Sequence, residues 1–342
     1  MVAFRYWQTT RRVALATACV GALVAAFAVW AATSSASTSA AKPTTLRVIF
    51  DWPGIDFEAV PITAGTAEGF YKKAGLDVQI VIPPTTSTTV KMLAVGKGDI
   101  GFDTTTDVVF AQAAGIDVKS IANYSQSNNW GLVAAPGKKI DLKHLKGKSV
   151  GIFTDSWTKA MMPYVLRAGH VSSGDVSQPI FSSNDIAPML AGKIDYATNT
   201  VNYAIAEVQS ATGKRPTVLL ATKFGAPNVP IWVYTATSSW LAKHGPEAKA
   251  FLAATKKAFA WSIAHPVAAV KDYVAAYPKI GGGENYSLAG WRATIPALGK
   301  PGSLLVQRKA EWTQVAQALK SVKLLSKPLP ASSYFTNAYV GG

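Results

Sequence analysis

Residues 50–80 read FDWPGIDFEAVPITAGTAEGFYKKAGLDVQI, and this stretch predicts the end of a strand, a loop, a helix and a second strand. The expected helix covers 59–74 with apolar residues at helical spacing. It ends at Gly75, a residue that favours the left-handed conformation common after helices. Residues 76–82 then alternate between apolar and polar side chains, which is typical of a strand. The stretch therefore predicts an α/β unit.

The same alternation of strands and helices runs through the rest of the chain. It predicts strands at 46–51, 76–82, 100–102, 118–122, 132–134, 149–153, 178–181, 194–197, 217–221 and 231–236. Helical patterns separate most of these strands, and three further helices are expected near the end, at 246–264, 266–276 and 308–322. Such alternation indicates an α/β fold with a mainly parallel sheet.

Two rounds of this pattern, with no low-complexity linker between them, predict two lobes. About 300 residues follow the first 41, and that length suits two domains of ordinary size. We expect the chain to cross between the lobes twice, near 124–131 and 224–234. The expected division places 42–127 plus 231–342 in lobe 1 and 128–230 in lobe 2.

The first 41 residues have the pattern of an export signal. They contain Arg5, Arg11 and Arg12 but no acid, then an apolar run at 13–32 and small residues at 33–41. This order predicts a cleaved signal peptide and a periplasmic or other extracytoplasmic protein. The apolar run has about the length that spans a bilayer, so an uncleaved membrane anchor stays an alternative. Arg11 and Arg12 leave twin-arginine export open beside the general route.

Composition excludes several classes of function. The net charge is +15, but the lysines are scattered and no basic helix with interleaved aromatic residues occurs, so we expect no nucleic-acid partner. Cys19, inside the leader, is the only cysteine, which excludes disulfides, thiolate metal sites and cysteine nucleophiles from the rest. The pattern GxGxxG at 96–101 lies between a helix and a strand, the reverse of a dinucleotide site.

No short motif of catalysis is present either. The four histidines lie in no HExxH pattern, and the sequence has no GxSxG or Walker motif. We therefore predict a protein that is not an enzyme, with no catalytic residues, no metal site and no cofactor. We expect it to be a monomer that binds a small molecule.

Polar and aromatic side chains gather where the predicted strands end. In an open α/β sheet, ligands bind at the carboxyl ends of the strands. Hydrogen-bonding groups beside aromatic rings suit a planar ligand, and the acids favour amino groups or cations. The alternative is ordinary helix capping, and Ser156 at a helix start could also hold an anion. The candidate ligand-binding residues, including one in the second crossing, are Asp51, Trp52, Asp103, Thr104, Thr105, Asp155, Ser156, Trp157, Asn199, Asn202, Tyr203 and Asn228.

In its order of short patterns the chain resembles bacterial solute-binding proteins of ABC importers. The similarity is to the branch whose members bind thiamine pyrimidine precursors, aliphatic sulfonates, taurine and nitrate. It covers about residues 46–275 and rests on DW at 51–52, EGFYKKAGLDV at 68–78, LAVGKGDIGF at 93–102, AAGIDVKSIA at 113–122, DLKHLKGKSVGI at 141–152, MLAGKIDY at 189–196 and VNYA at 201–204.

This resemblance implies a periplasmic binding protein fold of type II, with two crossover strands and the ligand clamped between the lobes. It also implies hinge closure and docking on an ABC permease in the inner membrane. DW at 51–52 and NY at 202–203 are most similar to binders of the thiamine pyrimidine precursor, where aromatic residues bracket a planar ring. The alternatives are a sulfonate, taurine or nitrate ligand, or a pyrimidine-synthesising enzyme. The related enzymes use a histidine and a cysteine-rich motif that this chain lacks.

Overall fold

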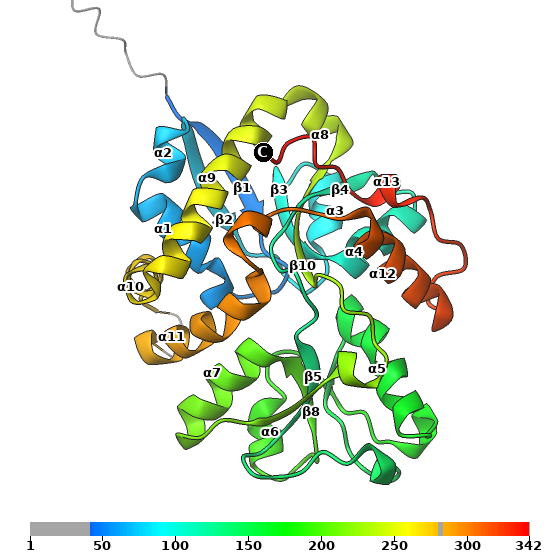
Figure 1. Cartoon of the computed structure of the whole chain (residues 1–342). Helices are drawn as coiled ribbons and strands as arrows, with labels where there is room; N and C mark the ends of the chain where they lie inside the picture. Colours follow the sequence, from blue (N-terminus) through cyan, green and yellow to red (C-terminus); the bar gives the residue numbers. More distant parts are fainter. Residues whose placement is uncertain (1–41, 280–282, 342) are drawn as a thin grey trace, which may run out of the picture. The chain divides into compact units, whose positions relative to one another are not determined.

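The structure, a computed structural model, describes residues 42–279 and 283–341 (Figure 1). The predicted signal peptide at 1–41 lies outside the described residues. Within them, every helix is too short or too polar to cross a lipid bilayer.

The first sheet has five strands in the order β2-β1-β3-β10-β4. β1 (Thr44–Ile49) pairs in parallel with β2 (Leu76–Val81) and with β3 (Ile100–Thr104). β10 (Trp232–Thr237) lies between β3 and β4 (Val118–Asn123) and runs antiparallel to both. The carboxyl ends of β1 and β3 therefore meet at one edge of the sheet.

Helices cover both faces of this sheet (Figure 1). Strand pleating sends Val48 to one face and Ile49 to the other, so each face has its own apolar layer. The first layer includes α1 (Val60–Ala67), α2 (Phe70–Lys73), α8 (Ser238–Lys243), α9 (Gly245–Ala264) and α10 (Pro266–Ala276). The second includes α3 (Thr89–Ala94), α4 (Thr105–Ala113), α12 (Lys309–Ser321) and α13 (Ala331–Tyr334). We call this sheet and its helices lobe 1.

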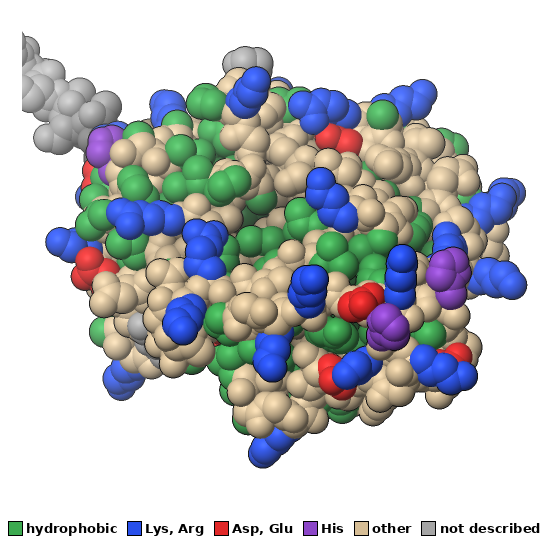
Figure 2. Space-filling view, turned by 60° about the horizontal axis from the view of Figure 1, so that its bottom comes forward, with side chains coloured by type: hydrophobic (Ala, Val, Ile, Leu, Met, Phe, Trp, Pro, Cys, Tyr) green, Lys and Arg blue, Asp and Glu red, His purple; other side chains and the backbone are tan. Residues whose placement is uncertain are grey.

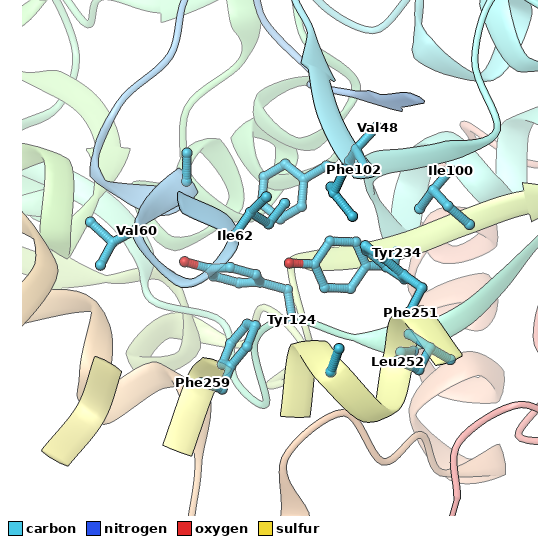
Figure 3. Close-up of a cluster of buried hydrophobic side chains, with 14 of the residues drawn as sticks. Val48, Val60, Ile62, Ile100, Phe102, Tyr124, Tyr234, Phe251, Leu252 and Phe259 are labelled. Carbon is cyan, nitrogen blue, oxygen red and sulfur yellow. The ribbon is translucent and has the colours of Figure 1, made fainter. Parts of the chain in front are cut away.

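Aromatic rings fill the first layer of lobe 1. Figure 3 shows Tyr124 and Tyr234 between the sheet and α9. Tyr124 meets Phe259 edge-on with ring centroids 5.1 Å apart, and Tyr234 meets Phe251 in the same way at 5.6 Å. Such pairs add about 0.5–1.5 kcal/mol each to the burial of the rings. This packing stabilises the sheet and so fixes the positions of the residues at the carboxyl ends of its strands.

The second sheet repeats the first with shorter strands. β5 (Trp130–Ala134) runs antiparallel between β8 (Ala197–Thr200) and β9 (Thr217–Leu220), and β6 (Ile152–Phe153) pairs in parallel with β7 (Ile180–Phe181). A parallel bridge between Val150 and Tyr196 joins these two parts. The resulting order β7-β6-β8-β5-β9 matches β2-β1-β3-β10-β4, with β5 in the place of β10. With α5 (Ser156–Ala168), α6 (Ile186–Leu190) and α7 (Val201–Thr212), these strands form lobe 2.

Two segments connect the lobes, at 124–129 and 225–231, and hydrogen bonds tie them together. The amide of Asn128 donates to Oδ1 of Asn228 (3.1 Å), and its side chain donates to the carbonyl of Pro227 (3.0 Å). The amide of Ile231 donates to the hydroxyl of Ser125 (3.0 Å). The predicted two-lobe α/β fold with two crossings is confirmed, while the lobe boundaries 42–127 plus 231–342 and 128–230 stay our proposal.

Two local expectations were wrong. The helix expected at 59–74 is broken at Gly69, whose φ of +71° is left-handed and ends the first helical segment. A further helix, α11 (Gly283–Thr294), was not expected because glycine, serine and aromatic residues give its sequence a weak helical preference. α11 is held by packing against α7, and the 3₁₀ turn Ile295–Leu298 follows it.

Candidate functional site

A cleft with a volume of about 610 Å³ lies between the carboxyl-terminal edges of the two sheets. Lobe 1 lines it with the loop that follows β1, with Trp232 of β10 and with Tyr286 of α11. Lobe 2 lines it with the ends of β6, β7 and β8 and with one face of α7. The strand order places these ends together, because the carboxyl ends of parallel strands share an edge.

Aromatic side chains form much of the cleft wall. Trp52 packs against Trp232 with ring centroids 5.1 Å apart and against Phe50 at 4.7 Å, and Phe102 lies beneath Trp232 in a stacked arrangement. The indole nitrogens of Trp157 and Trp232 are buried and have no hydrogen-bond partner among the described residues. The aromatic lining residues are Trp52, Phe57, Trp130, Phe153, Trp157, Phe181, Tyr203, Trp232 and Tyr286.

The charged residues that line the cleft are opposite in sign to the net charge of the whole chain. The sequence has 34 lysine and arginine residues against 19 acids, and basic side chains are scattered over the face shown in Figure 2. The 28 described lining residues include five acids and no lysine, arginine or histidine. The acids are Asp51, Asp56, Glu58, Asp155 and Glu207. A site with this lining suits a cation or a donor of several hydrogen bonds, and its described residues offer no positive charge to hold an anion.

Burial raises the pKa of three of these carboxyl groups, those of Asp51, Asp56 and Glu58. Desolvation raises the pKa of Asp56 to about 7. The pKa of Glu58 is raised well above its ordinary value by desolvation and then by the nearby Asp56. That of Asp51 is raised in the same way, by desolvation and then by Asp107 and Asp103. A cation or an amino group in the cleft would relieve this cost by pairing with the ionised carboxylates.

One face of α7 lines the cleft at helical spacing. Tyr203, Glu207, Ser210 and Ala211 lie at positions i, i+4, i+7 and i+8. Glu207 accepts a hydrogen bond from the side chain of Asn184 (2.9 Å) and another from the hydroxyl of Tyr286 (3.0 Å). The second bond joins lobe 2 to lobe 1 across the cleft.

The structure brings half of the predicted residues to the cleft wall. These are Asp51, Trp52, Asp155, Trp157, Asn199 and Tyr203. Asp155 also caps α5, because Oδ1 accepts from the amide of Thr158 at 2.7 Å. The side-chain amide of Asn199 donates a long hydrogen bond to Asp185 (3.4 Å), and its Oδ1 accepts from the amide of Thr200 at the start of α7 (2.9 Å). Their part in ligand binding stays a prediction.

Four other predicted residues lie behind the wall, where α4 and α5 begin. Thr104 caps α4 in a reciprocal box with Asp107, and Thr105 donates to the carbonyl of Pro230 (2.9 Å). The hydroxyl of Ser156 is engaged with those of Thr104 (3.0 Å) and Thr106 (2.6 Å), which joins the lobes. Asp103 is buried and accepts from the hydroxyl of Thr235. Because the hydroxyl of Ser156 is already engaged in these contacts, it is not free to hold an anion.

The last two predicted residues lie elsewhere. Asn202 is next to Tyr203 in sequence, but it points about 100° away around the helix. Its side chain donates to Glu58 (2.7 Å) and Thr294 (3.1 Å), so it ties lobe 2 to lobe 1. Asn228 lines a second cavity of about 920 Å³ behind the crossings. Neither residue is among those lining the 610 Å³ cleft.

Several of the lining residues were not predicted from the sequence. Asp56 and Glu58 lie in the loop after DW, where no periodicity indicates which side chains turn inward. Trp232 follows the second crossing, and Tyr286 lies on the unexpected helix α11. Glu207 could have been found, because it lies one helical turn after the predicted Tyr203.

Comparison with known proteins finds synthases that are similar in sequence and binding proteins that are similar in structure. A family model described as "NMT1/THI5 like" matches residues 56–269, more than half of the chain. A 4-amino-5-hydroxymethyl-2-methylpyrimidine phosphate synthase, THI13 of Saccharomyces cerevisiae, is 25% identical over 252 residues, which cover 70% of this chain and 74% of that protein.

Two solved structures share the fold at low identity. The alkanesulfonate-binding protein SsuA of Xanthomonas axonopodis superposes with a TM-score of 0.66 at 16% identity, covering 86% of this chain and 100% of that one. The periplasmic nitrate-binding protein NrtA of Synechocystis PCC 6803 gives 0.62 at 14% identity, covering 87% and 88%. The protein therefore has the periplasmic binding protein fold, as predicted.

The prediction that the chain is not an enzyme was wrong in the light of these relatives, since several of them are named as pyrimidine phosphate synthases. It rested on missing cysteine, histidine and serine motifs. Carboxyl groups in a closed cleft can also transfer protons, and a pKa near 7, as for Asp56, suits that role. A search for short motifs does not detect such groups.

Proposed function

Because the chain belongs to the NMT1/THI5-like family, we propose that its cleft captures a small planar heteroaromatic molecule that carries an amino group, such as a thiamine pyrimidine precursor. The observation that carries this proposal is the lining of the cleft. Nine aromatic rings and five carboxyl groups line it, and none of the described lining residues is basic. Rings stack on a planar ligand, and carboxylates accept hydrogen bonds from its amino group.

The dimensions of the cleft support a ligand of this size. Small-molecule pockets occupy about 300–1,000 Å³, and the cleft, at about 610 Å³, falls inside that range. Trp52 and Trp232 offer one aromatic wall from lobe 1, and Trp157 and Tyr203 offer another from lobe 2. A flat ring held between the two walls would bring the lobes together, and only stronger binding to the closed form can drive such closure.

We further propose that the protein acts outside the cytoplasm and delivers its ligand to an ABC permease. The support is the fold, which periplasmic sulfonate- and nitrate-binding proteins share, together with the signal-like sequence of residues 1–41. The ligands of those two proteins are anions, and a cleft with five carboxyl groups and no basic residue among its described lining offers them no positive charge. We therefore favour the amino-bearing ring over a sulfonate, taurine or nitrate.

A second candidate function comes from the curated relatives. Their names describe a synthase of 4-amino-5-hydroxymethyl-2-methylpyrimidine phosphate. The same cleft would then hold the pyrimidine as a product, and Asp56 could transfer a proton. Both functions place the same ring in the same cleft, so the fate of the ligand distinguishes them.

The experiment is a thermal-shift screen of the purified protein. The panel contains thiamine, the hydroxymethyl- and formylamino-pyrimidine precursors, riboflavin, taurine, alkanesulfonates and nitrate. We expect a pyrimidine to raise the melting temperature, with a change in tryptophan fluorescence that Trp52→Ala removes. Stabilisation by sulfonate or nitrate alone would contradict the proposal.

Mass spectrometry then separates binding from synthesis. The protein is purified from producing cells, and the small molecules that it releases on denaturation are identified. A stabilising pyrimidine is also incubated with the protein and recovered. If the pyrimidine is recovered unchanged after an incubation that is long compared with the turnover time of an ordinary enzyme, the protein captures its ligand without converting it. Its conversion, or the accumulation of a pyrimidine phosphate with time, supports the synthase.

A further inference from the structure

Three carboxyl groups meet beneath the floor of the cleft in lobe 1. Asp51 follows β1, Asp103 belongs to β3, and Asp107 lies in the first turn of α4. One carboxylate oxygen of each lies within 4.8 Å of the others. Their exposed fractions are only 1%, 0% and 5%. The capping box of α4 and the pairing of β1 with β3 fix the three positions.

Several of these oxygens have no partner. Neither carboxylate oxygen of Asp51 accepts a hydrogen bond from any described residue, and Oδ1 of Asp103 has none either. The other oxygen of Asp103 accepts from Thr235, and Oδ2 of Asp107 accepts from the hydroxyl of Thr104 at 2.6 Å. Buried polar atoms are almost always paired, and leaving one unpaired costs about 1–3 kcal/mol. Three unpaired oxygens on two carboxylates of this cluster therefore indicate a bound group.

The spacing of the oxygens fits a single metal ion. Calcium binds oxygen at about 2.3–2.6 Å, so two oxygens on opposite sides of one ion are about 4.6–5.2 Å apart. The observed limit of 4.8 Å allows one ion to contact all three carboxylates. Carboxylate oxygens are the ligands that hard cations prefer. We propose that Asp51, Asp103 and Asp107 bind one hard divalent cation, of the class of Ca²⁺, Mg²⁺ or Mn²⁺.

An organic ligand in the cleft cannot take the place of this ion. Asp51 lines the cleft, but Asp103 and Asp107 do not. A ring in the cleft could thus reach only one of the three carboxylates, whereas a single ion could reach all three. The amide of Ser87 donates to the backbone carbonyl of Asp51 (3.0 Å), and its buried hydroxyl has no hydrogen-bond partner among the described residues, so it offers a further neutral oxygen beside Asp51.

The proposed ion would also connect the two lobes. Asp155 of lobe 2 precedes Ser156, whose hydroxyl lies within hydrogen-bond distance of those of Thr104 (3.0 Å) and Thr106 (2.6 Å), so the start of α5 lies beside the three acids. Without a cation, these like charges oppose approach of the lobes. With one, the repulsion becomes attraction, and the cleft closes more readily. The sequence analysis predicted no metal site because Asp51 and Asp103 are far apart in the chain and form no short motif.

The test is a titration of the chelator-stripped protein with Mn²⁺, with free Mn²⁺ followed by electron paramagnetic resonance. We expect one saturable ion per chain, displaced by Ca²⁺ or Mg²⁺. Asp103→Asn should weaken binding by about tenfold or more, since losing even an indirect partner of a metal costs about 10–100-fold. The matched control is Asp185→Asn, which replaces a buried acid of lobe 2 bonded to the amide of Thr198 (2.7 Å) and should bind Mn²⁺ normally.

Two results would overturn the proposal. One is the lack of saturable Mn²⁺ binding by the stripped wild-type protein, which would mean that the three acids share protons instead. The other is equal binding by wild type and by folded Asp103→Asn, which would place the ion on the surface. Circular dichroism establishes that each variant folds. If Asp103→Asn does not fold, Thr235→Val, which removes the hydroxyl that orients Asp103, takes its place with the same expected loss. The titration needs no pyrimidine, so its outcome is independent of the proposed function.

Discussion

The two lobes have the same strand order but line the shared cleft with different chemistry. Lobe 1 contributes three acids, Asp51, Asp56 and Glu58, and two neutral hydroxyl groups, those of Thr86 and Tyr286. Lobe 2 contributes two acids, Asp155 and Glu207, with nine residues whose side chains carry a hydroxyl or an amide. Topology thus decides where the lining residues stand, and the residue types decide which part of a ligand each lobe recognises. We infer that lobe 1 holds the charged or amino end and lobe 2 orients the rest.

The lobes also differ in how their aromatic residues are supported. Trp157 of lobe 2 is 2% exposed and belongs to a buried apolar cluster, whereas Trp52 of lobe 1 is half-buried on a base of Phe50 and Phe102. Trp157 therefore both stabilises the core of lobe 2 and lines the cleft, whereas Trp52 mainly lines the cleft.

Replacing each of the two tryptophans by alanine should separate a role in stability from a role in binding, and it should give the largest changes. Trp157→Ala should lower the free energy of unfolding by about 3–5 kcal/mol, because a buried tryptophan leaves a large cavity. Trp52→Ala should cost clearly less stability but weaken ligand binding by about 1–3 kcal/mol. Urea denaturation and calorimetric titration measure the two quantities. Equal losses of stability in both variants would contradict the distinction.

The next effect tests the charge of lobe 1. Asp56→Asn keeps the acceptor for the amide of Glu58 but removes the negative charge, and it should weaken an amino-bearing ligand by about 1.5–3 kcal/mol. Ser183→Ala in lobe 2 should cost only about 0.5–1.5 kcal/mol. Isothermal titration calorimetry compares them. A larger loss in Ser183→Ala would reverse the roles of the lobes.

The same residue predicts a dependence on pH. Because the pKa of Asp56 is about 7, its carboxylate forms only as the pH rises through 7, and the affinity should rise with it. The free energy of unfolding of the ligand-free protein should instead decrease as the pH rises. The native state holds this proton to a higher pH than the unfolded chain, whose aspartate titrates near 4, so the contribution of Asp56 falls between about pH 4 and 7. Asp56→Asn should flatten both trends.

A third effect concerns the sheets themselves. A Cβ at Gly131 of β5 would overlap the backbone carbonyl of Leu219 in β9, whereas at Gly101 of β3 it would meet side chains of Asp103, Thr235 and Leu93. Gly131→Ala should destabilise the protein by about 1–3 kcal/mol or more, because backbone cannot move aside. Gly101→Ala should cost less. Thermal unfolding of the two variants checks the order, and the opposite order would show that the second sheet adapts more easily.

The smallest effect lies at the contact between the lobes. Tyr286→Phe removes one hydrogen bond to Glu207, which keeps its bond from Asn184, so the loss should be about 0.5–1.5 kcal/mol. Tyr277→Phe, a half-buried tyrosine whose ring packs against Tyr273, is the matched control. Thermal denaturation measures both, and a loss no greater than that of the control would show that the bond contributes nothing.

The sequence predicted the kind of fold better than the direction of individual side chains. Alternating patterns identified the strands and the crossings, because periodicity is a local property. They could not identify the shared strand order, which depends on pairing between distant segments. At the site, Tyr203 was predicted and its neighbour Asn202 was predicted with it, yet the two point to different places because one residue turns a helix by about 100°. Asp56 and Glu58 lie in a loop without periodicity.

The ligand preference of the cleft can be measured directly by one pair of calorimetric titrations at pH 8, with 4-amino-5-hydroxymethyl-2-methylpyrimidine and with methanesulfonate. We expect the pyrimidine to bind one per chain and the sulfonate to release no binding heat, because the cleft presents five carboxyl groups and no basic residue among its described lining. Binding of the sulfonate without the pyrimidine would contradict this expectation and would show that the acids of the cleft do not select the ligand.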